Sequence, residues 1–201
     1  MFAHLLQFAR RQHDAHALDQ GEQQRRDALI PRLKDIRFLI FDFDGVFTNN
    51  LVIVSEEGKE SVLCNRSDGL GIGMLRAHVD MAVLTAELNP APLRRCEKLR
   101  LECVQVEKHK LPALQQMLAK RSLEPAQAAF VGNDVNDIPC MQHVGVGIAV
   151  ADAWPQVKAA AHAVTTRAGG RGAVREVIEW FLQARGTSAL AQVQTPRPDA
   201  R

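Results

Sequence analysis

The stretch Asp42-Phe43-Asp44-Gly45-Val46 decides the fold of this chain. It follows a short run, Ile36-Arg37-Phe38-Leu39-Ile40-Phe41, whose β-branched and aromatic side chains predict a buried parallel strand. The two carboxylates lie two residues apart, so they leave the end of an extended strand on the same side. Neighbouring acids repel each other and lose hydration, which is tolerated where a cation neutralises them or where chemistry needs them. Gly45 lets the backbone turn away at once.

The composition is that of an ordinary soluble globular protein. The chain has 201 residues, which predicts one domain, and 46% of them are apolar and 24% charged. A net charge of +2 without a long basic stripe argues against nucleic acid or an anionic membrane as a partner. No apolar stretch approaches the roughly 20 residues that span a bilayer, and the N-terminal residues are too polar for a signal peptide. We therefore expect a cytoplasmic protein.

Strand-like and helix-like segments alternate from Ile36 onward. The segment over 47–64 predicts a β-hairpin. Residues 1–34 are expected to form an N-terminal extension outside the core, residues 35–185 the main domain, and residues 186–201 a mobile tail. The remaining pattern predicts strands over 36–41, 80–84, 102–106, 128–131, 147–150 and 163–165, helices over 68–78, 90–100, 110–121, 137–143 and 172–184, and short helices in the extension near 5–9 and over 28–33.

This alternation predicts an α/β fold with a doubly wound, Rossmann-like parallel sheet. In such sheets, ligands bind at the carboxyl ends of the strands. The residues that follow the predicted strands should therefore meet at one rim: Asp42, Asp44, Thr85, Lys110, Asn133, Asp134 and Asp137. Acids, a hydroxyl group and a lysine at one rim form a much more specific signal than any one of them.

These residue types suit phosphoryl transfer. A carboxylate can attack phosphorus to form an aspartyl-phosphate, while a second carboxyl group protonates the leaving alkoxide and then deprotonates the attacking water. A divalent cation cancels the repulsion between carboxylate and phosphate, and Mg²⁺ suits because it prefers oxygen ligands. A hydroxyl group and a lysine hold the transferring group. Taken singly, Thr85 also fits a strand-end cap and Lys110 a solvated lysine, although a cation near a helix N-terminus opposes the helix dipole.

Residues 36–184 resemble the haloacid dehalogenase superfamily of phosphatases. The first motif of that superfamily matches Asp42-Phe43-Asp44-Gly45-Val46-Phe47-Thr48, the second Val83-Leu84-Thr85, the third Lys110, and the fourth Gly132-Asn133-Asp134-Val135-Asn136-Asp137. The resemblance implies that Asp42 is the nucleophile and Asp44 the general acid and base, and that Thr85, Ala86 and Lys110 bind phosphate. It places Mg²⁺ on Asp42, the Asp44 carbonyl, and Asn133 or Asp134. Asp137 then either caps the next helix or holds Lys110 by an ion pair.

The hairpin, Asn65-Arg66-Ser67-Asp68-Gly69 and the stretch from Ala168 to Glu176 resemble the 3-deoxy-D-manno-octulosonate 8-phosphate phosphatase family. That family includes phosphatases of nine-carbon 2-keto-3-deoxy acids and the C-terminal domains of some acylneuraminate cytidylyltransferases. Its members lack a large cap domain, and the space after the first motif leaves no room for one here. The family implies a homotetramer, assembled through the hairpin, in which a neighbour closes the active site.

Two positions depart from the family pattern. The fourth motif usually begins Gly-Asp-Asp, and here its first acid is Asn133, whose amide oxygen can ligate Mg²⁺ but brings no charge. The second motif usually continues Gly-Arg or Gly-Glu, and here Thr85 is followed by Ala86 and Glu87. Glu87, with Lys98 further along the helix, resembles the members that act on nine-carbon acids more than the octulosonate members, which carry Arg.

Three further residues are candidates for substrate binding. Arg66 and Asp68 lie at the predicted substrate rim, although they also fit a surface pair. Arg171, between glycines, either belongs to a flexible turn or offers its guanidinium to a phosphate or carboxylate, even across a subunit boundary. The leading hypothesis is a Mg²⁺-dependent phosphatase of an eight- or nine-carbon 2-keto-3-deoxy sugar acid. The alternative is a catalytically weak oligomerisation module associated with a nucleotidyltransferase, and a phosphomutase or phosphonatase is weaker still.

Overall fold

A computed structural model describes residues 20–194 of the chain, and its centre is a six-stranded parallel sheet. Strand β1 (Phe38–Phe41) lies in the interior with all four residues buried, as its apolar sequence predicts. In register, Phe41 pairs with Val83 on one side and Val131 on the other, so the carboxyl ends of the three strands lie at the same edge of the sheet. The sheet order is β5-β4-β1-β6-β7-β8, with β4 (Asp80–Thr85), β5 (Glu102–Gln105), β6 (Ala128–Gly132), β7 (Val146–Ala149) and β8 (Ala163–Val164).

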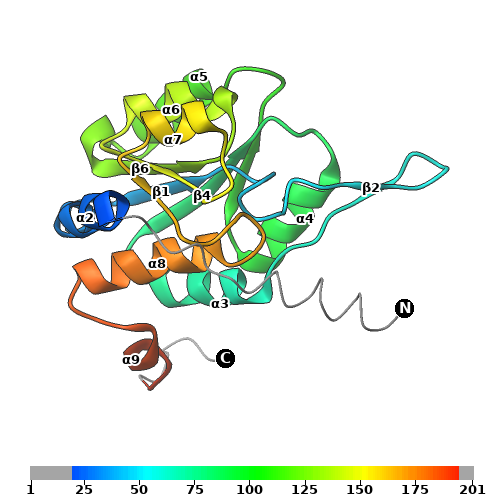
Figure 1. Cartoon of the computed structure of the whole chain (residues 1–201). Helices are drawn as coiled ribbons and strands as arrows, with labels where there is room; N and C mark the ends of the chain where they lie inside the picture. The colour runs from blue at the N-terminus through cyan, green and yellow to red at the C-terminus, as the bar shows by residue number, and fades with distance from the viewer. Residues whose placement is uncertain (1–19, 195–201) are drawn as a thin grey trace.

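Helices cover both faces of this sheet (Figure 1). One face carries α3 (Arg66–Leu75) and α8 (Ala173–Ala184), and α4 (Pro90–Leu99) packs against α3. The opposite face carries α5 (Lys110–Lys120), α6 (Ile138–His143) and α7 (Pro155–Ala160). Short 3-10 turns precede β1, β6 and α6: η1 (Ile30–Lys34), η2 (Pro125–Gln127) and η3 (Val135–Asp137). The predicted doubly wound α/β fold is confirmed. Helix α7 was missed because Val157 is its single buried residue, so its sequence shows no apolar repeat.

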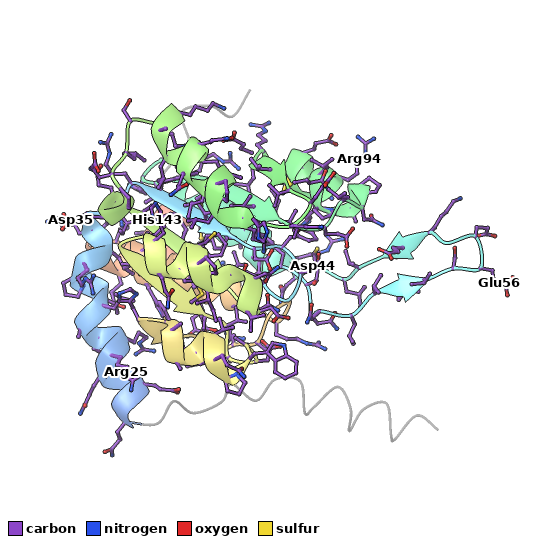
Figure 2. All side chains as sticks on the ribbon, turned by 90° about the horizontal axis from the view of Figure 1, so that it is seen from above. Arg25, Asp35, Asp44, Glu56, Arg94 and His143 are labelled. Atoms are coloured by element: carbon purple, nitrogen blue, oxygen red, sulfur yellow. The ribbon has the colours of Figure 1, made fainter. Side chains whose placement is uncertain are left out.

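The predicted hairpin between β1 and α3 is confirmed, with shorter strands than expected. Strands β2 (Ile53–Val54) and β3 (Glu60–Ser61) pair antiparallel, and a bridge between Thr48 and Cys64 closes the base. The hairpin projects away from the sheet in Figure 1, and Figure 2 shows Glu56 at its tip and Asp44 near its base. No large cap domain interrupts this part of the described chain.

Part of the predicted N-terminal extension belongs to the core. Helix α2 (Gln20–Leu29) leads into η1, and Leu29, Ile30 and Leu33 are buried in the core. Arg185 strengthens this contact, since its guanidinium donates to the carbonyls of Leu33 and Ile36. The expectation that residues 28–33 lie outside the core is therefore wrong, because burial depends on what packs over the segment rather than on its own polarity.

The C-terminal segment also differs from its prediction. A short helix, α9 (Ala189–Gln194), forms within the expected mobile tail and lies near α3. The predicted short helix near residues 5–9 and the end of the tail lie outside the described residues. Among the described helices, none has both the length and the apolar character needed to cross a membrane.

If Leu33 is a core residue, truncating it should destabilise the fold. Leu33→Ala removes a side chain with no exposed surface and is expected to lower the free energy of unfolding by about 2–5 kcal/mol. Leu190→Ala is the matched control, because Leu190 is 68% exposed and should change stability by less than about 0.5 kcal/mol. Urea unfolding of both variants measures the difference, and equal effects would mean that η1 lies outside the core.

Candidate active site

A buried lysine joins two carboxylates at the carboxyl end of the sheet. Lys110 begins α5, and its Nζ lies 2.6 Å from Asp42 Oδ1 and 2.7 Å from Asp137 Oδ1. Asp42 directly follows β1, and its backbone N–H donates to the carbonyl of Val131 in β6. Because the lysine is only 2% exposed, it acts as a fixed positive charge inside the protein rather than as a surface group. The sequence-predicted nucleophile and phosphate-binding lysine are thus in direct contact.

The two carboxylates share one ammonium group, and this imbalance shapes the electrostatics. Burial and the nearby charge of Asp137 raise the pKa of Asp42 to about 7, although Lys110 opposes the shift. Burial alone would lower the pKa of Lys110, but Asp42 and Asp137 raise it above its ordinary value. The lysine is therefore charged, and a cation near Asp42 would complete the neutralisation.

Of the two roles that the sequence left open for Asp137, the structure shows the ion pair with Lys110, and its side chain does not cap α6. Its Oδ1 pairs with Lys110, while its Oδ2 accepts from the backbone N–H groups of Asn133 at 2.9 Å and Asp134 at 3.3 Å. Gly132 permits this arrangement, since a Cβ there would lie 2.6 Å from the Asp137 carboxylate. One side chain thus fixes both the lysine and the loop after β6.

Asp44 is half-buried beside the hairpin base, where Thr48 holds it. The Thr48 hydroxyl donates to Asp44 Oδ1 at 3.4 Å and accepts from the Gly45 N–H at 3.1 Å. Burial raises the pKa of Asp44, and the charge of Glu87 raises it further, while the bond from Thr48 lowers it. A raised pKa favours the protonated form that a general acid needs.

Thr85 ends β4 at the same rim. It is 1% exposed, and its hydroxyl accepts from the Glu87 N–H at 3.1 Å, which bends the chain around Ala86. Thr85 and Ala86 therefore form a tight corner next to Asp42 on the neighbouring strand.

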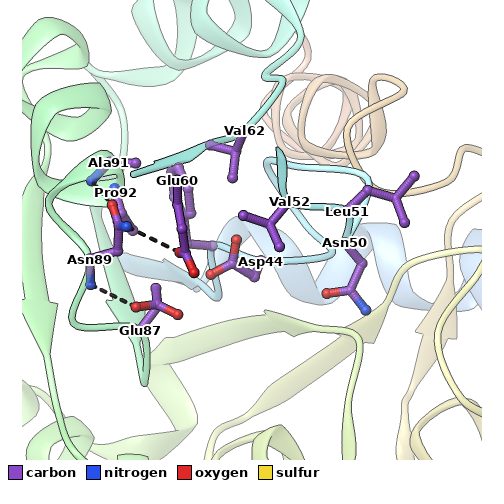
Figure 3. A pocket seen from close by; sticks show the side chains of 11 residues that line it. Asp44, Asn50, Leu51, Val52, Glu60, Val62, Glu87, Asn89, Ala91 and Pro92 are labelled. Atoms are coloured by element: carbon purple, nitrogen blue, oxygen red, sulfur yellow. Dashed lines mark hydrogen bonds between the residues drawn. The ribbon is translucent and has the colours of Figure 1, made fainter. Parts of the chain in front are cut away.

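A pocket of about 230 Å³ opens beside Asp44, between the hairpin and the start of α4 (Figure 3). Two carboxylates flank it: Glu60 accepts from Asn89 Nδ2 at 3.1 Å, and Glu87 accepts from the Asn89 N–H at 2.6 Å. No lysine or arginine lines it within the described chain, and its full lining is Phe43, Asp44, Asn50, Leu51, Val52, Glu60, Val62, Glu87, Asn89, Ala91 and Pro92. The pocket therefore favours hydroxyl or amide donors over a second anion.

The comparisons with known proteins agree with this geometry. The family model described as haloacid dehalogenase-like hydrolase matches residues 83–178. The 3-deoxy-D-manno-octulosonate 8-phosphate phosphatase of Escherichia coli K12 is 38% identical over 169 residues, which are 83% of this chain and 90% of that protein. The chain belongs to this phosphatase family. It is therefore a phosphoric monoester hydrolase with the haloacid dehalogenase-like fold.

Solved structures of family members have the same fold. The Yersinia pestis 3-deoxy-D-manno-octulosonate 8-phosphate phosphatase is 38% identical, with a TM-score of 0.77, and the match covers 80% of this chain and 88% of that one. The Moraxella catarrhalis enzyme is 31% identical, with a TM-score of 0.76 over 79% of this chain and 92% of that one. That structure was solved in complex with a magnesium ion, a phosphate ion and a KDO molecule.

The donor set of this phosphatase fits a divalent cation. Asn133 Oδ1 is buried and has no hydrogen-bond partner, an arrangement that costs free energy unless a ligand meets the oxygen. Its amide lies against Gly45, where a Cβ would come within 2.0 Å of Nδ2. Asp134 Oδ1 instead accepts from the Val135 N–H at 2.6 Å. Residues 20–194 contain no metal-binding group of three or more His, Cys, Asp or Glu side chains, so a cation here would need amide and carbonyl oxygens as well.

Four predicted substrate residues lie away from this pocket. Asp68 is fully buried, and its Oδ1 accepts from the Arg175 N–H at 2.9 Å, so it caps α8 instead of forming a surface pair with Arg66. Arg66 is exposed at the first position of α3. Lys98 lies in the last turn of α4 and makes no ion pair with Glu87 in the described structure. Arg171 lies in the turn before α8.

The sequence reasoning missed two residues next to Asp44. Thr48 is part of the first motif, and a buried hydroxyl that follows an acid by four residues was a usable signal. Glu60 had no such signal, because its place in the pocket depends on how the hairpin folds back toward α4.

The buried Asp68 predicts a pH-dependent stability. Burial raises its pKa to about 6, so between about pH 4 and pH 6 the folded protein binds more protons than the unfolded chain. The free energy of unfolding should therefore fall as pH rises through this window, by on the order of 3 kcal/mol. Asp68→Asn keeps an acceptor for Arg175 but cannot ionise, so its stability relative to wild type should increase across the window. Urea unfolding at pH 4.5, 5.5 and 7.5 measures this difference.

Asp68→Ala separates the effect of the Asp68 charge on stability from the effect of its hydrogen bond to α8. It lacks the acceptor for the Arg175 N–H and should be less stable than Asp68→Asn by about 1–2 kcal/mol at each pH. Parallel pH profiles for wild type and Asp68→Asn would refute the electrostatic account.

Proposed function

We propose that this phosphatase hydrolyses the phosphomonoester of a 2-keto-3-deoxy sugar acid, with 3-deoxy-D-manno-octulosonate 8-phosphate as the leading substrate. The observation that carries the proposal is the buried Asp42 carboxylate, held 2.6 Å from Lys110 and followed by the half-buried Asp44 at a pocket. A fixed carboxylate beside a fixed cation suits attack on a phosphoryl group. Asp44 lines this pocket, and we place the leaving group there.

The proposed reaction has two displacements. An Asp42 oxygen attacks phosphorus to form an aspartyl-phosphate, the P–O bond to the sugar breaks, and Asp44 gives its proton to the leaving alkoxide. Asp44 then takes a proton from water as that water attacks the aspartyl-phosphate, which releases inorganic phosphate and regenerates Asp42. Lys110 and the Thr85 corner hold the phosphoryl oxygens, and Asp137 keeps Lys110 in place.

Mg²⁺ is the cofactor that the donor set favours. We propose that the Asp42 carboxylate, the Asp44 carbonyl and Asn133 Oδ1 hold it, with Asp134 as the less favoured alternative because its carboxylate already caps η3. When bound, the cation supplies positive charge that offsets repulsion between the carboxylate and the phosphate dianion.

Different observations support an eight-carbon and a nine-carbon acid as the substrate. The names of the relatives, such as the Escherichia coli enzyme at 38% identity, support the octulosonate. Glu87 at the pocket wall supports a nine-carbon acid, since its carboxylate can accept from additional hydroxyl or N-acyl groups. Because Glu60 and Glu87 repel anions, we propose that the carboxylate of either acid points out of this pocket.

Homotetramer formation through the hairpin is part of the proposal. Leu51, Ile53, Val54 and Leu63 are each at least 59% exposed, which is unfavourable for a solvated ribbon and suits contact with another copy. A catalytically weak oligomerisation module beside an acylneuraminate cytidylyltransferase would use the same surface. The Asp42–Lys110–Asp137 arrangement supports an enzyme instead, since a silent module would have no use for three buried charges.

A panel of sugar-acid phosphates tests the substrate. With Mg²⁺, kcat/KM for 3-deoxy-D-manno-octulosonate 8-phosphate should exceed that for ketodeoxynonulosonate and acylneuraminate 9-phosphates by about tenfold or more. The reverse order would establish the nine-carbon substrate. Asp42→Asn is expected to abolish turnover on all of them, because an amide is not a competent nucleophile. A folded wild-type protein that turns over none of these substrates would favour the silent module.

Asn133→Asp tests the proposed cation site without measuring activity. The added carboxylate should lower the melting temperature of the metal-free protein, because it adds a like charge beside Asp42. It should also tighten Mg²⁺ binding by about tenfold, since charged oxygen ligands bind the ion more strongly. Asn136→Asp is the control, because Asn136 is exposed in the same loop. Titration calorimetry reports both affinities, and equal tightening in the two variants would exclude Asn133 as a ligand.

A further inference from the structure

The turn that contains Gly169 and Gly170 lies directly on the backbone that follows Asp44. A Cβ at Gly169 would come within 1.8 Å of the Gly45 carbonyl oxygen, and one at Gly170 within 2.5 Å of the Asn49 nitrogen. The Gly170 N–H donates to the Val46 carbonyl at 3.0 Å. Only glycine allows two backbones to approach this closely. The contact therefore accounts for glycine at both positions, and a need for flexibility in the turn is not required to explain them.

This turn is itself held firmly from two sides. The Gly169 N–H donates to Asp152 Oδ1 at 2.9 Å, in the loop after β7. Glu176 in α8 accepts from the Thr166 hydroxyl at 2.8 Å and from the N–H groups of Thr166 and Arg167, both at 2.9 Å. Charge-assisted bonds of this kind are stronger than neutral ones and fix the turn relative to the sheet. The turn therefore presents a rigid surface to residues 45–49.

The contacted segment controls the position of Asp44. Thr48 is fully buried, and its hydroxyl accepts from the Gly45 and Asn50 N–H groups while it donates to Asp44 Oδ1. A shift of the Gly45 carbonyl would rotate the peptides on which this hydroxyl depends. Displacing a proton-transferring group by about 1 Å can cost roughly a hundredfold in rate.

We propose that Gly169 and Gly170 are positioning residues that act through Thr48 to aim Asp44 at the leaving group. This inference rests on the proposed function, in which Asp44 is the general acid. It gives the Gly169-Gly170-Arg171-Gly172 stretch a role that does not depend on the Arg171 side chain. Asp152 and Glu176 support the same contact by holding the turn in place.

Gly169→Ala tests the proposal through the leaving group. A sugar phosphate leaves as an alkoxide that needs a proton, whereas 4-nitrophenyl phosphate leaves as a stable phenolate. We expect kcat/KM to fall about a hundredfold for 3-deoxy-D-manno-octulosonate 8-phosphate and less than about threefold for the aryl phosphate. Equal losses on both substrates, or no loss on either, would overturn the proposal, because a merely structural defect does not distinguish leaving groups.

Two further sets of variants test whether the loss of activity arises from the Gly169 contact and from the Thr48 hydroxyl. Gly186→Ala also replaces a glycine, at a φ of +68° with nothing within 4 Å of the new Cβ, and should leave both kcat/KM values unchanged. Thr48→Val should reproduce the selective loss on the sugar phosphate, and Thr48→Ser, which keeps the hydroxyl, should restore most of it. Loss in Thr48→Val without rescue by Thr48→Ser would contradict a role for the hydroxyl.

Amide hydrogen exchange tests this inference independently of the proposed function. If the wild type hydrolyses neither phosphate, the proposed function fails. Amide exchange of residues 45–50 still reports whether the turn of Gly169 and Gly170 holds this segment. Gly169→Ala should speed that exchange at least tenfold, and Gly186→Ala should leave it unchanged. Unchanged exchange in Gly169→Ala would refute the proposal that this turn holds residues 45–50, whether or not the protein is active.

Discussion

The rest of the site depends on the ion triad in which Lys110 lies between Asp42 and Asp137. Burying a charge without a partner costs several kcal/mol, so none of the three is stable in this interior without the others. The triad also joins the end of β1, the start of α5 and the loop after β6, which are far apart in the sequence. Loss of Lys110 would leave two buried carboxylates without their cation, and loss of either carboxylate would remove one of the two groups that hold the lysine, so the triad fixes the geometry of the sheet rim.

The triad carries a chemical consequence as well. Two carboxylates and one ammonium leave a negative charge over, and burial together with the charge of Asp137 raises the pKa of Asp42 to about 7. A bound cation would remove this excess, and Asn133, in the loop that Asp137 holds, offers a buried oxygen without a hydrogen-bond partner. Asp44, two residues after Asp42, is supported differently. Its position depends on Thr48 and on the turn of Gly169 and Gly170 before α8. The proposed nucleophile and the proposed proton donor therefore depend on different supporting residues.

Much of the fold and the centre of the site could be predicted from the sequence. Apolar runs alternating with helical periods define a parallel sheet, and a parallel sheet collects the residues after its strands at one edge. Asp42, Lys110 and Asp137 meet for this reason. The same reasoning failed for Leu33 and Asp68, because their burial is decided by α8, which comes much later in the chain.

The sequence by itself determined that the chain forms a parallel sheet and which polar residues follow its strands, because those features follow from local periodicity and short motifs. The same motifs are the basis of the reacting groups that we propose. Only the tertiary structure decided that Asp68 is a buried cap, that Glu60 joins the pocket from the hairpin, and that Gly169 lies against Gly45. These are contacts between segments distant in sequence. They arise from close packing and hydrogen-bond satisfaction across the whole domain, and local sequence patterns do not encode such distances.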